Sequence, residues 1–130
     1  NYRTPSEIMA EAGPVIRAAL PDADVPTSLR DSGIPVRYGR PQDLPAVLEE
    51  WLGEHEAGTA AVIADSGDRA CPGAPYGPRV RVLTPDLAKG LEFDLVVLVR
   101  PESYGAGTAG AVARYVAMTR STRELVILRD

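Results

Sequence analysis

The fold is decided by the stretch Asp94-Leu95-Val96-Val97-Leu98-Val99, in which five consecutive side chains are branched and apolar. Such a strand is typical of the interior of a parallel sheet, where helices cover both faces. Four more strands are predicted from shorter apolar or alternating runs at 34–38, 60–64, 80–83 and 125–128. Pro35 places the first of these at an edge of the sheet, because proline cannot donate to a strand ladder.

Helical patterns alternate with these strands. Apolar residues at helical spacing predict helices over 5–20, 42–56 and 108–119. In the first helix, Thr4 and Glu7 have the spacing of a capping box, and Gly13-Pro14 predicts a kink or an early end. In the second, Trp51 lies on the apolar stripe and is expected in the core. The order of elements predicts an α/β fold with three layers and a mainly parallel sheet.

Composition restricts the class of protein. The chain has 130 residues, 45% of them hydrophobic and 25% charged, which indicates one globular domain and excludes collagen-like, coiled-coil and disordered chains. No apolar run is long enough for a membrane span, and no signal peptide is recognised, so we expect a cytoplasmic protein without membrane contact. Cys71 and His55, one of each type, leave no cluster for zinc. A net charge of −4 disfavours a free-standing nucleic-acid binder.

Three segments carry residues that a plain connector does not need: 1–4, 84–93 and 115–123. We expect them beyond the carboxyl ends of strands, where parallel sheets bind ligands. Lys89 and Gly90 offer a cation and a backbone amide to a phosphate, and Glu92 offers an acceptor to ribose hydroxyls. The P-loop spacing is absent from the sequence, so the chain holds no complete nucleotide site of that kind.

Taken together, the three segments resemble the second RecA-like domain of UvrD/Rep-like superfamily 1 helicases. Asn1-Tyr2-Arg3-Thr4 is similar to helicase motif IV. Leu83-Thr84-Pro85-Asp86-Leu87-Ala88-Lys89-Gly90-Leu91-Glu92-Phe93 is similar to motif V, and Tyr115-Val116-Ala117-Met118-Thr119-Arg120-Ser121 to motif VI. The motifs occur in the family's order, and the resemblance covers residues 1–130. It implies a three-layer RecA-like domain without its own P-loop, in a fragment of a longer chain.

In that family ATP binds between two RecA-like domains. The resemblance implies that Arg3 and Arg120 are arginine fingers, which stabilise charge on the transferred phosphoryl group. By the same resemblance Tyr2 stacks on the adenine and Glu92 faces the ribose and phosphates. ATP and Mg²⁺ are the implied cofactors, with most of their ligands on the N-terminal RecA-like domain. The fragment alone is therefore expected to be inactive as an ATPase.

The other motif V residues are assigned by the same resemblance. Lys89 and Gly90 lie in the stretch that senses nucleotide, and Thr84 matches a position that faces the nucleic acid. Asp86 stands where the family commonly has histidine, which weakens the expected contact with DNA. The implied partners are the N-terminal RecA-like domain of the same chain and either single-stranded DNA or RNA polymerase.

Alternatives stay open at this point. Only 80 residues separate Arg3 from Thr84, too few for the large inserted domain of strand-separating helicases. This short form is similar to the HelD-like branch, whose members release RNA polymerase from nucleic acid. The chain also fits a non-catalytic RecA-like binding module. If these residues have no functional role, Arg3 and Arg120 are surface cations, Tyr2 is a packed edge aromatic, and Lys89-Gly90 is a turn.

Overall fold

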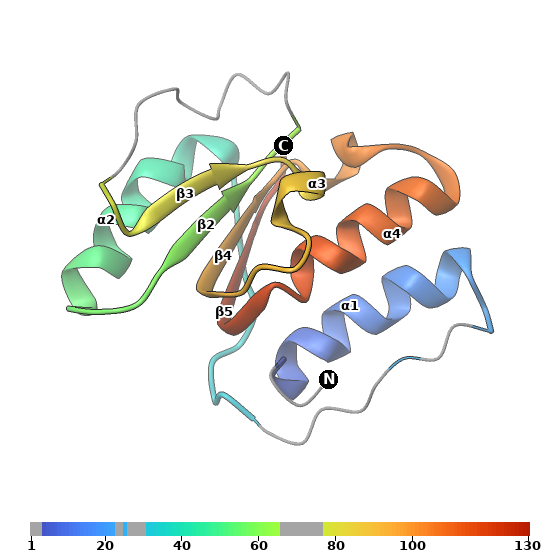
Figure 1. Ribbon diagram of the computed structural model, residues 1–130, viewed down its shortest axis with the longest axis horizontal. Coiled ribbons are helices and arrows are strands. Elements are labelled where there is room, and N and C mark those ends of the chain that lie inside the picture. Colours follow the sequence, from blue (N-terminus) through green and yellow to red (C-terminus); the bar gives the residue numbers. More distant parts are fainter. Residues whose placement is uncertain (1–3, 23–24, 26–30, 66–76) are drawn as a thin grey trace.

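The five strands form a single parallel sheet. The computed structural model describes residues 4–22, 25, 31–65 and 77–130. Within them the strand order is β1-β5-β4-β2-β3, and each neighbouring pair is parallel (Figure 1). The strands are β1 (Arg37–Gly39), β2 (Ala60–Ile63), β3 (Val80–Leu83), β4 (Phe93–Val99) and β5 (Ser121–Leu128). The predicted α/β class is confirmed, and β1 lies at an edge as Pro35 indicated.

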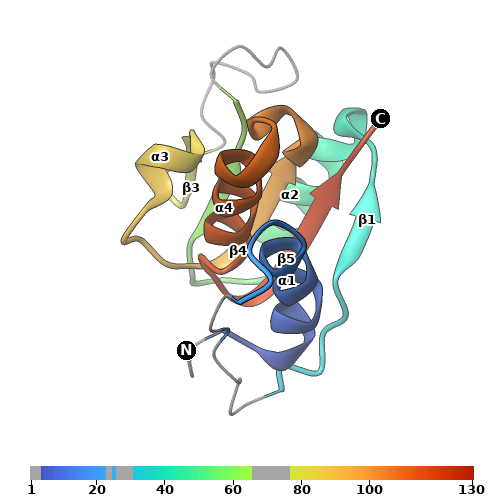
Figure 2. The same ribbon diagram turned by 90° about the vertical axis from the view of Figure 1, so that its right-hand side faces the viewer.

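Helices cover both faces of the sheet and make three layers. The helices are α1 (Ser6–Ala19), α2 (Leu44–Glu54), the short α3 (Pro85–Ala88) and α4 (Gly107–Met118), with 3₁₀ turns at Pro41–Asp43 and Pro101–Tyr104. α1 and α4 lie side by side on one face, and α2 lies on the other (Figure 2). No helix in the described parts of the chain is long and apolar enough to cross a membrane.

Alternate residues of β4 pack into two separate hydrophobic cores, one on each face of the sheet. On one face Val96 and Leu98 pack in a cluster that includes Ile8 of α1 and Met118 of α4. On the other face Val97 packs in a cluster with residues of α2, among them the buried Trp51. Because β4 is buried on both faces, its apolar run needs no alternation with polar residues.

The start of α1 differs from the prediction. The expected capping box does not form: Pro5 is the N-cap residue and makes no side-chain cap bond. The Glu7 carboxylate instead accepts hydrogen bonds from the backbone N–H groups of Ser32 (3.0 Å) and Gly33 (2.8 Å). The helix also continues past Pro14, which is exposed, while Ala12 and Ile16 of the same helix are buried. Burial of that face outweighs the hydrogen bond that proline removes.

Two strands begin at residues other than those predicted: β1 begins at Arg37, three residues after the predicted start at Ile34. β5 begins at Ser121, four residues before the predicted strand, because Ser121 pairs with Phe93 of β4. The connector after β3 contains α3, whose first turn is capped by Thr84. Residues 65–78 are rich in glycine, proline and other turn-forming residues, which predicts a loop. Most of this segment, Cys71 included, lies outside the described residues.

Candidate functional site

Motifs V and VI meet at the amino ends of β4 and β5. Arg120 directly precedes β5, and its carbonyl oxygen accepts a hydrogen bond from the Phe93 backbone N–H at 2.9 Å. Phe93 and Ser121 are opposite each other in the sheet. Glu92 and Arg120, the residues immediately before this pair, are therefore brought together although they lie 28 positions apart in the sequence (120 − 92).

The end of motif IV reaches the same place. The Thr4 side chain is buried, with 1% of its surface exposed. Its hydroxyl donates a hydrogen bond to the backbone carbonyl of Thr119, 3.3 Å away and 115 positions later in the sequence. Tyr2 and Arg3 lie outside the described residues, so their predicted roles stay predictions. All three motifs thus have at least one residue at this edge of the sheet.

The Arg120 side chain is anchored to the last turn of α4. Its Nε–H donates to the Val116 carbonyl at 3.0 Å, and one outer nitrogen donates to the Thr119 hydroxyl at 3.4 Å. The carbonyl end of a helix carries partial negative charge and so favours a cation. A guanidinium has five N–H donors, and these two bonds use two of them. Arg120 is half-buried, which leaves part of the group accessible to an anion.

Arg120 also affects the titration of its neighbour in motif VI. Partial burial raises the pKa of the Tyr115 phenol above its usual 10.0, while the charges of Arg120 and Arg17 act in the opposite direction. Two cations, one from α4–β5 and one from α1, therefore act on the same ring. Burial is the larger effect, so the neutral phenol is favoured overall.

The remaining motif V residues are more exposed. Lys89 Nζ lies 3.4 Å from a carboxylate oxygen of Asp86, and both side chains are largely in solvent, where such a pair stabilises little. Gly90 has a φ of +78°, a conformation that favours glycine, and an added Cβ would meet no atom within 4 Å. The backbone conformation of the turn is therefore enough to explain why residue 90 is a glycine. Glu92 is exposed.

The expectation that all three segments lie beyond carboxyl ends of strands is wrong. Thr84 does follow the carboxyl end of β3, where its hydroxyl accepts from the Leu87 N–H at 3.4 Å. Glu92 and Arg120 precede β4 and β5 and so lie at the opposite edge. Motif V runs from one edge to the other through α3 and the segment that follows it (Figure 1). The structure therefore separates Thr84, predicted to face nucleic acid, from Glu92 and Arg120, predicted to face nucleotide, whereas Lys89 and Gly90 follow directly on α3.

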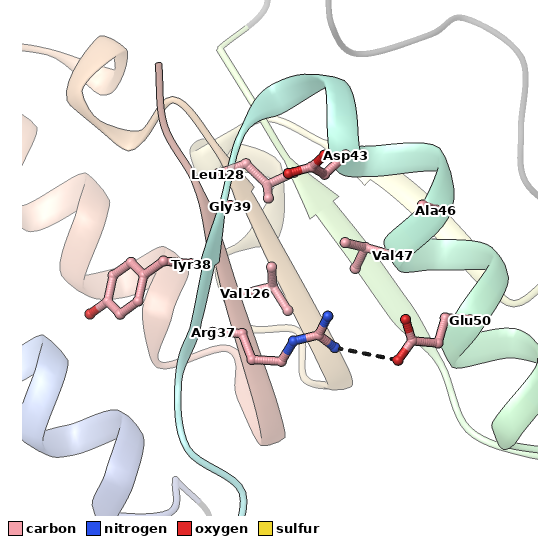
Figure 3. Close-up of a pocket in the computed structure, with 9 residues that line it drawn as sticks. All are labelled: Arg37, Tyr38, Gly39, Asp43, Ala46, Val47, Glu50, Val126 and Leu128. Atoms are coloured by element: carbon pink, nitrogen blue, oxygen red, sulfur yellow. Dashed lines mark ion pairs between the residues drawn. The ribbon is translucent and has the colours of Figure 1, made fainter.

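The candidate site is an edge of the sheet and does not coincide with the described cavities. A pocket of about 210 Å³ lies between β1 and α2, where Arg37 and Glu50 form an ion pair at 3.9 Å (Figure 3). A wider one of about 560 Å³ lies between α1, α4 and the end of β5. Neither is lined by a predicted site residue. In the described segments no group of three or more histidine, cysteine, aspartate or glutamate side chains fits a metal ion.

Sequence reasoning gave no role at this site to two hydroxyl groups, those of Thr4 and Thr119. Both residues are buried: Thr4 is 1% exposed and Thr119 is 5% exposed. Thr4 directly follows Arg3 and Thr119 directly precedes Arg120, the two arginines predicted as fingers. The adjacency of threonine and arginine in two separate motifs was the available signal. The contact between them depends on how α1 and α4 pack, which no local pattern reveals.

The comparisons with known proteins concern the family and the fold. Residues 55–129, more than half of the chain, match the model of the viral superfamily 1 RNA helicase core domain. The chain belongs to this family. The matched range of the helicase core domain includes motifs V and VI and leaves out motif IV. The superfamily predicted from the sequence is thus confirmed, whereas the UvrD/Rep-like subgroup stays a prediction.

A solved structure shares the fold of this helicase core domain. The C-terminal domain of a possible DNA helicase from Lactobacillus plantarum WCFS1 superposes with a TM-score of 0.63 and 19% sequence identity. The alignment covers 99% of this chain and 87% of the other. At that identity the likeness establishes the RecA-like fold of a helicase C-terminal domain. No curated protein sequence matches the chain.

Proposed function

We propose that this chain is the arginine-finger half of an ATP-dependent superfamily 1 helicase or translocase. The observation that carries the proposal is the meeting of motifs IV, V and VI at the amino edge of the sheet, with the Arg120 guanidinium hydrogen-bonded to the last turn of α4. In this role Arg120 stabilises the negative charge that develops on the transferred phosphoryl group. Arg3, Tyr2 and Glu92 complete the proposed nucleotide edge, and Lys89 and Gly90 sense the nucleotide.

We propose that a second RecA-like domain of the same protein completes the ATP site. The arginine donors of this chain suit phosphate oxygens. The described residues hold no ligand set for Mg²⁺, and the sequence has no P-loop, so those elements are assigned to the other domain. Mg²⁺ bound there supplies neutralisation of phosphate charge. Thr84, at the opposite edge, is the proposed contact with nucleic acid, and the closing of two domains on ATP would drive movement along the strand.

The decisive experiment is Arg120→Ala in the full-length protein. Loss of an arginine finger lowers ATP turnover by about 10³-fold to 10⁵-fold in related phosphoryl-transfer enzymes. Arg37→Ala is the matched control, because Arg37 is an exposed arginine whose ion pair lies in the β1–α2 pocket, away from the motifs. Steady-state ATP turnover of both variants is measured with saturating nucleic acid. Turnover of Arg120→Ala equal to that of Arg37→Ala rejects the finger role and favours a non-catalytic module.

A second candidate is a HelD-like ATPase that releases RNA polymerase from nucleic acid. Two observations favour it: the net charge of −4, and the short stretch between α1 and β3, whose described elements are β1, a 3₁₀ turn, α2 and β2. The test compares stimulation of ATP turnover by single-stranded DNA, single-stranded RNA and a stalled polymerase complex. Stimulation by the polymerase complex alone supports release, and stimulation by a bare strand supports translocation on that strand.

A further inference from the structure

We infer that Thr119, with Thr4 packed behind it, is a positioning residue that holds the Arg120 guanidinium in place. The inference rests on the proposed function of Arg120 and adds a specific requirement to it. We call Thr4 and Thr119 the hydroxyl clamp. One hydrogen bond of the clamp joins Thr4, at the end of motif IV, to Thr119 in motif VI, and a second joins Thr119 to the Arg120 guanidinium.

The Thr119 hydroxyl is turned back onto its own helix. It lies 3.0 Å from the Tyr115 carbonyl and 3.1 Å from the Val116 carbonyl, so its single proton is shared between these acceptors. With the proton directed to the helix, the oxygen lone pairs accept the N–H of the Arg120 outer nitrogen at 3.4 Å. Val116 holds the Nε–H of the same guanidinium. The orientation of the hydroxyl and the orientation of Arg120 are therefore linked.

Such hydrogen bonds restrict the rotamers of the flexible arginine side chain. A free arginine side chain has many rotamers in solution, and an arginine finger acts only in the rotamer that reaches the phosphoryl group. The contacts at Val116 and Thr119 fix the plane of the guanidinium at two of its nitrogens. Valine at 119 would keep the shape of the buried side chain and remove the acceptor. The fold should therefore tolerate Thr119→Val, whereas the Arg120 guanidinium should lose its fixed orientation.

Thr4 holds the other side of the clamp. Its buried hydroxyl donates to the Thr119 carbonyl, the last carbonyl before Arg120. Thr4 directly follows Arg3, the other predicted finger. The side chain of the residue after one predicted finger is thus joined to the backbone of the residue before the other by one hydrogen bond across 115 positions of sequence. Loss of the Thr4 hydroxyl should weaken the same step as loss of the Thr119 hydroxyl, by a smaller factor, because it acts through the backbone.

The test uses the full-length protein with Thr119→Val, Thr119→Ser, Thr4→Val, Arg120→Ala and the double variant Thr119→Val/Arg120→Ala. Thr108→Val is the matched control, being the same substitution at an exposed position near the start of α4. Two quantities are measured: kcat and KM for ATP, and the affinities for ADP and for ADP with aluminium fluoride, an analogue of the transferring phosphoryl group. Thermal melting reports whether each variant is folded.

Thr119→Val should lower kcat by roughly tenfold to a hundredfold, as expected for a lost hydrogen bond to a charged group, with little change in KM. Affinity for ADP with aluminium fluoride should fall by a similar factor, while affinity for ADP alone is unchanged. Thr119→Ser should restore most of the rate, and Thr108→Val should behave as wild type. Because Thr119 acts through Arg120, the double variant should be no slower than Arg120→Ala alone.

The outcomes separate this inference from the proposed function. Wild-type turnover in Arg120→Ala overturns both. Slow turnover in Arg120→Ala with wild-type turnover in Thr119→Val overturns the positioning role alone, as does a double variant whose losses add. If Thr119→Val shows no cooperative melting transition, Thr4→Val takes its place in the double-variant comparison with Arg120→Ala, and additive losses there overturn the role.

Discussion

A methyl group added at Gly110 should destabilise α4, the helix to which the Arg120 side chain is hydrogen-bonded. A Cβ at this position would lie 2.0 Å from the carbonyl oxygen of Gly105 and 2.4 Å from its carbonyl carbon. Non-bonded heavy atoms normally approach to about 3.5 Å, so the 105–110 turn would have to move by more than about 1 Å. The same Cβ would also crowd Arg114, whose guanidinium donates to the Gly105 carbonyl at 3.3 Å.

The size of the effect follows from two opposing contributions. Alanine in place of glycine in a helix gains about 1 kcal/mol of helix propensity. Forcing atoms into filled space costs about 1–3 kcal/mol, and the upper part of that range applies here because the opposing atoms are backbone. The net expectation for Gly110→Ala is a loss of about 2 kcal/mol in the free energy of unfolding. For a chain of this length that lowers the unfolding temperature by roughly 8 °C.

Thermal and urea unfolding of the chain, followed by circular dichroism, measures this loss. Gly53→Ala is the matched control: it is an exposed glycine within α2, and its added Cβ would meet no atom within 4 Å. That variant should be as stable as wild type or more stable by about 0.5 kcal/mol, since the position is close to the helix end. Equal stability of the two variants would refute the close approach of Gly105 and Gly110.

Two further predictions concern titration. The backbone N–H of Ser32 in particular holds the pKa of Glu7 below its ordinary 4.5, so the stability that the ionised carboxylate contributes is present above that value and is lost as the pH falls through the lowered pKa. Urea midpoints of wild type and Glu7→Gln should therefore differ at neutral pH and converge in acid, and a pH-independent difference would contradict this. Arg120→Ala should raise the pKa of Tyr115 further, because it removes a nearby positive charge. Ultraviolet titration, with Tyr115→Phe to assign the signal and Arg37→Ala as control, measures that shift, and an unchanged Tyr115 pKa would argue against the placement of Arg120.

The sequence predicted the elements whose side chains are buried in a regular pattern. Leu98 and Trp51 lie in the core, as their positions in an apolar run and on a helical stripe indicated. The first half of β5 could not be predicted in the same way, because Thr122 and Arg123 have no strand-like alternation of apolar residues. Those residues are extended because Ser121 pairs with Phe93, a partner that the local sequence does not reveal.

The candidate site was predictable only through the spacing of its motifs. Resemblance to the helicase motifs selected Arg120 and Glu92, and the pairing of β4 with β5 brings them together. The capping box was wrong because its two members found partners elsewhere. Thr4 donates to the Thr119 carbonyl, and Glu7 accepts from the loop at 32–33. Both partners are distant in sequence, so a rule that considers only spacings of three residues could not choose them.

The strand order has a consequence for biosynthesis. β5 is the last strand in the sequence and lies between β1 and β4 in the sheet. On the ribosome, β1 has no strand neighbour until residues through Leu128 are made, 89 positions after its own end at Gly39 (128 − 39). After β4 is complete, 29 more residues (128 − 99) must follow, which takes about 1.5 to 6 s at typical rates of synthesis. Until β5 is inserted, the backbone N–H and C=O groups along one edge of β4 and one edge of β1 have no partner strand, and the insertion of β5 closes both edges in one step.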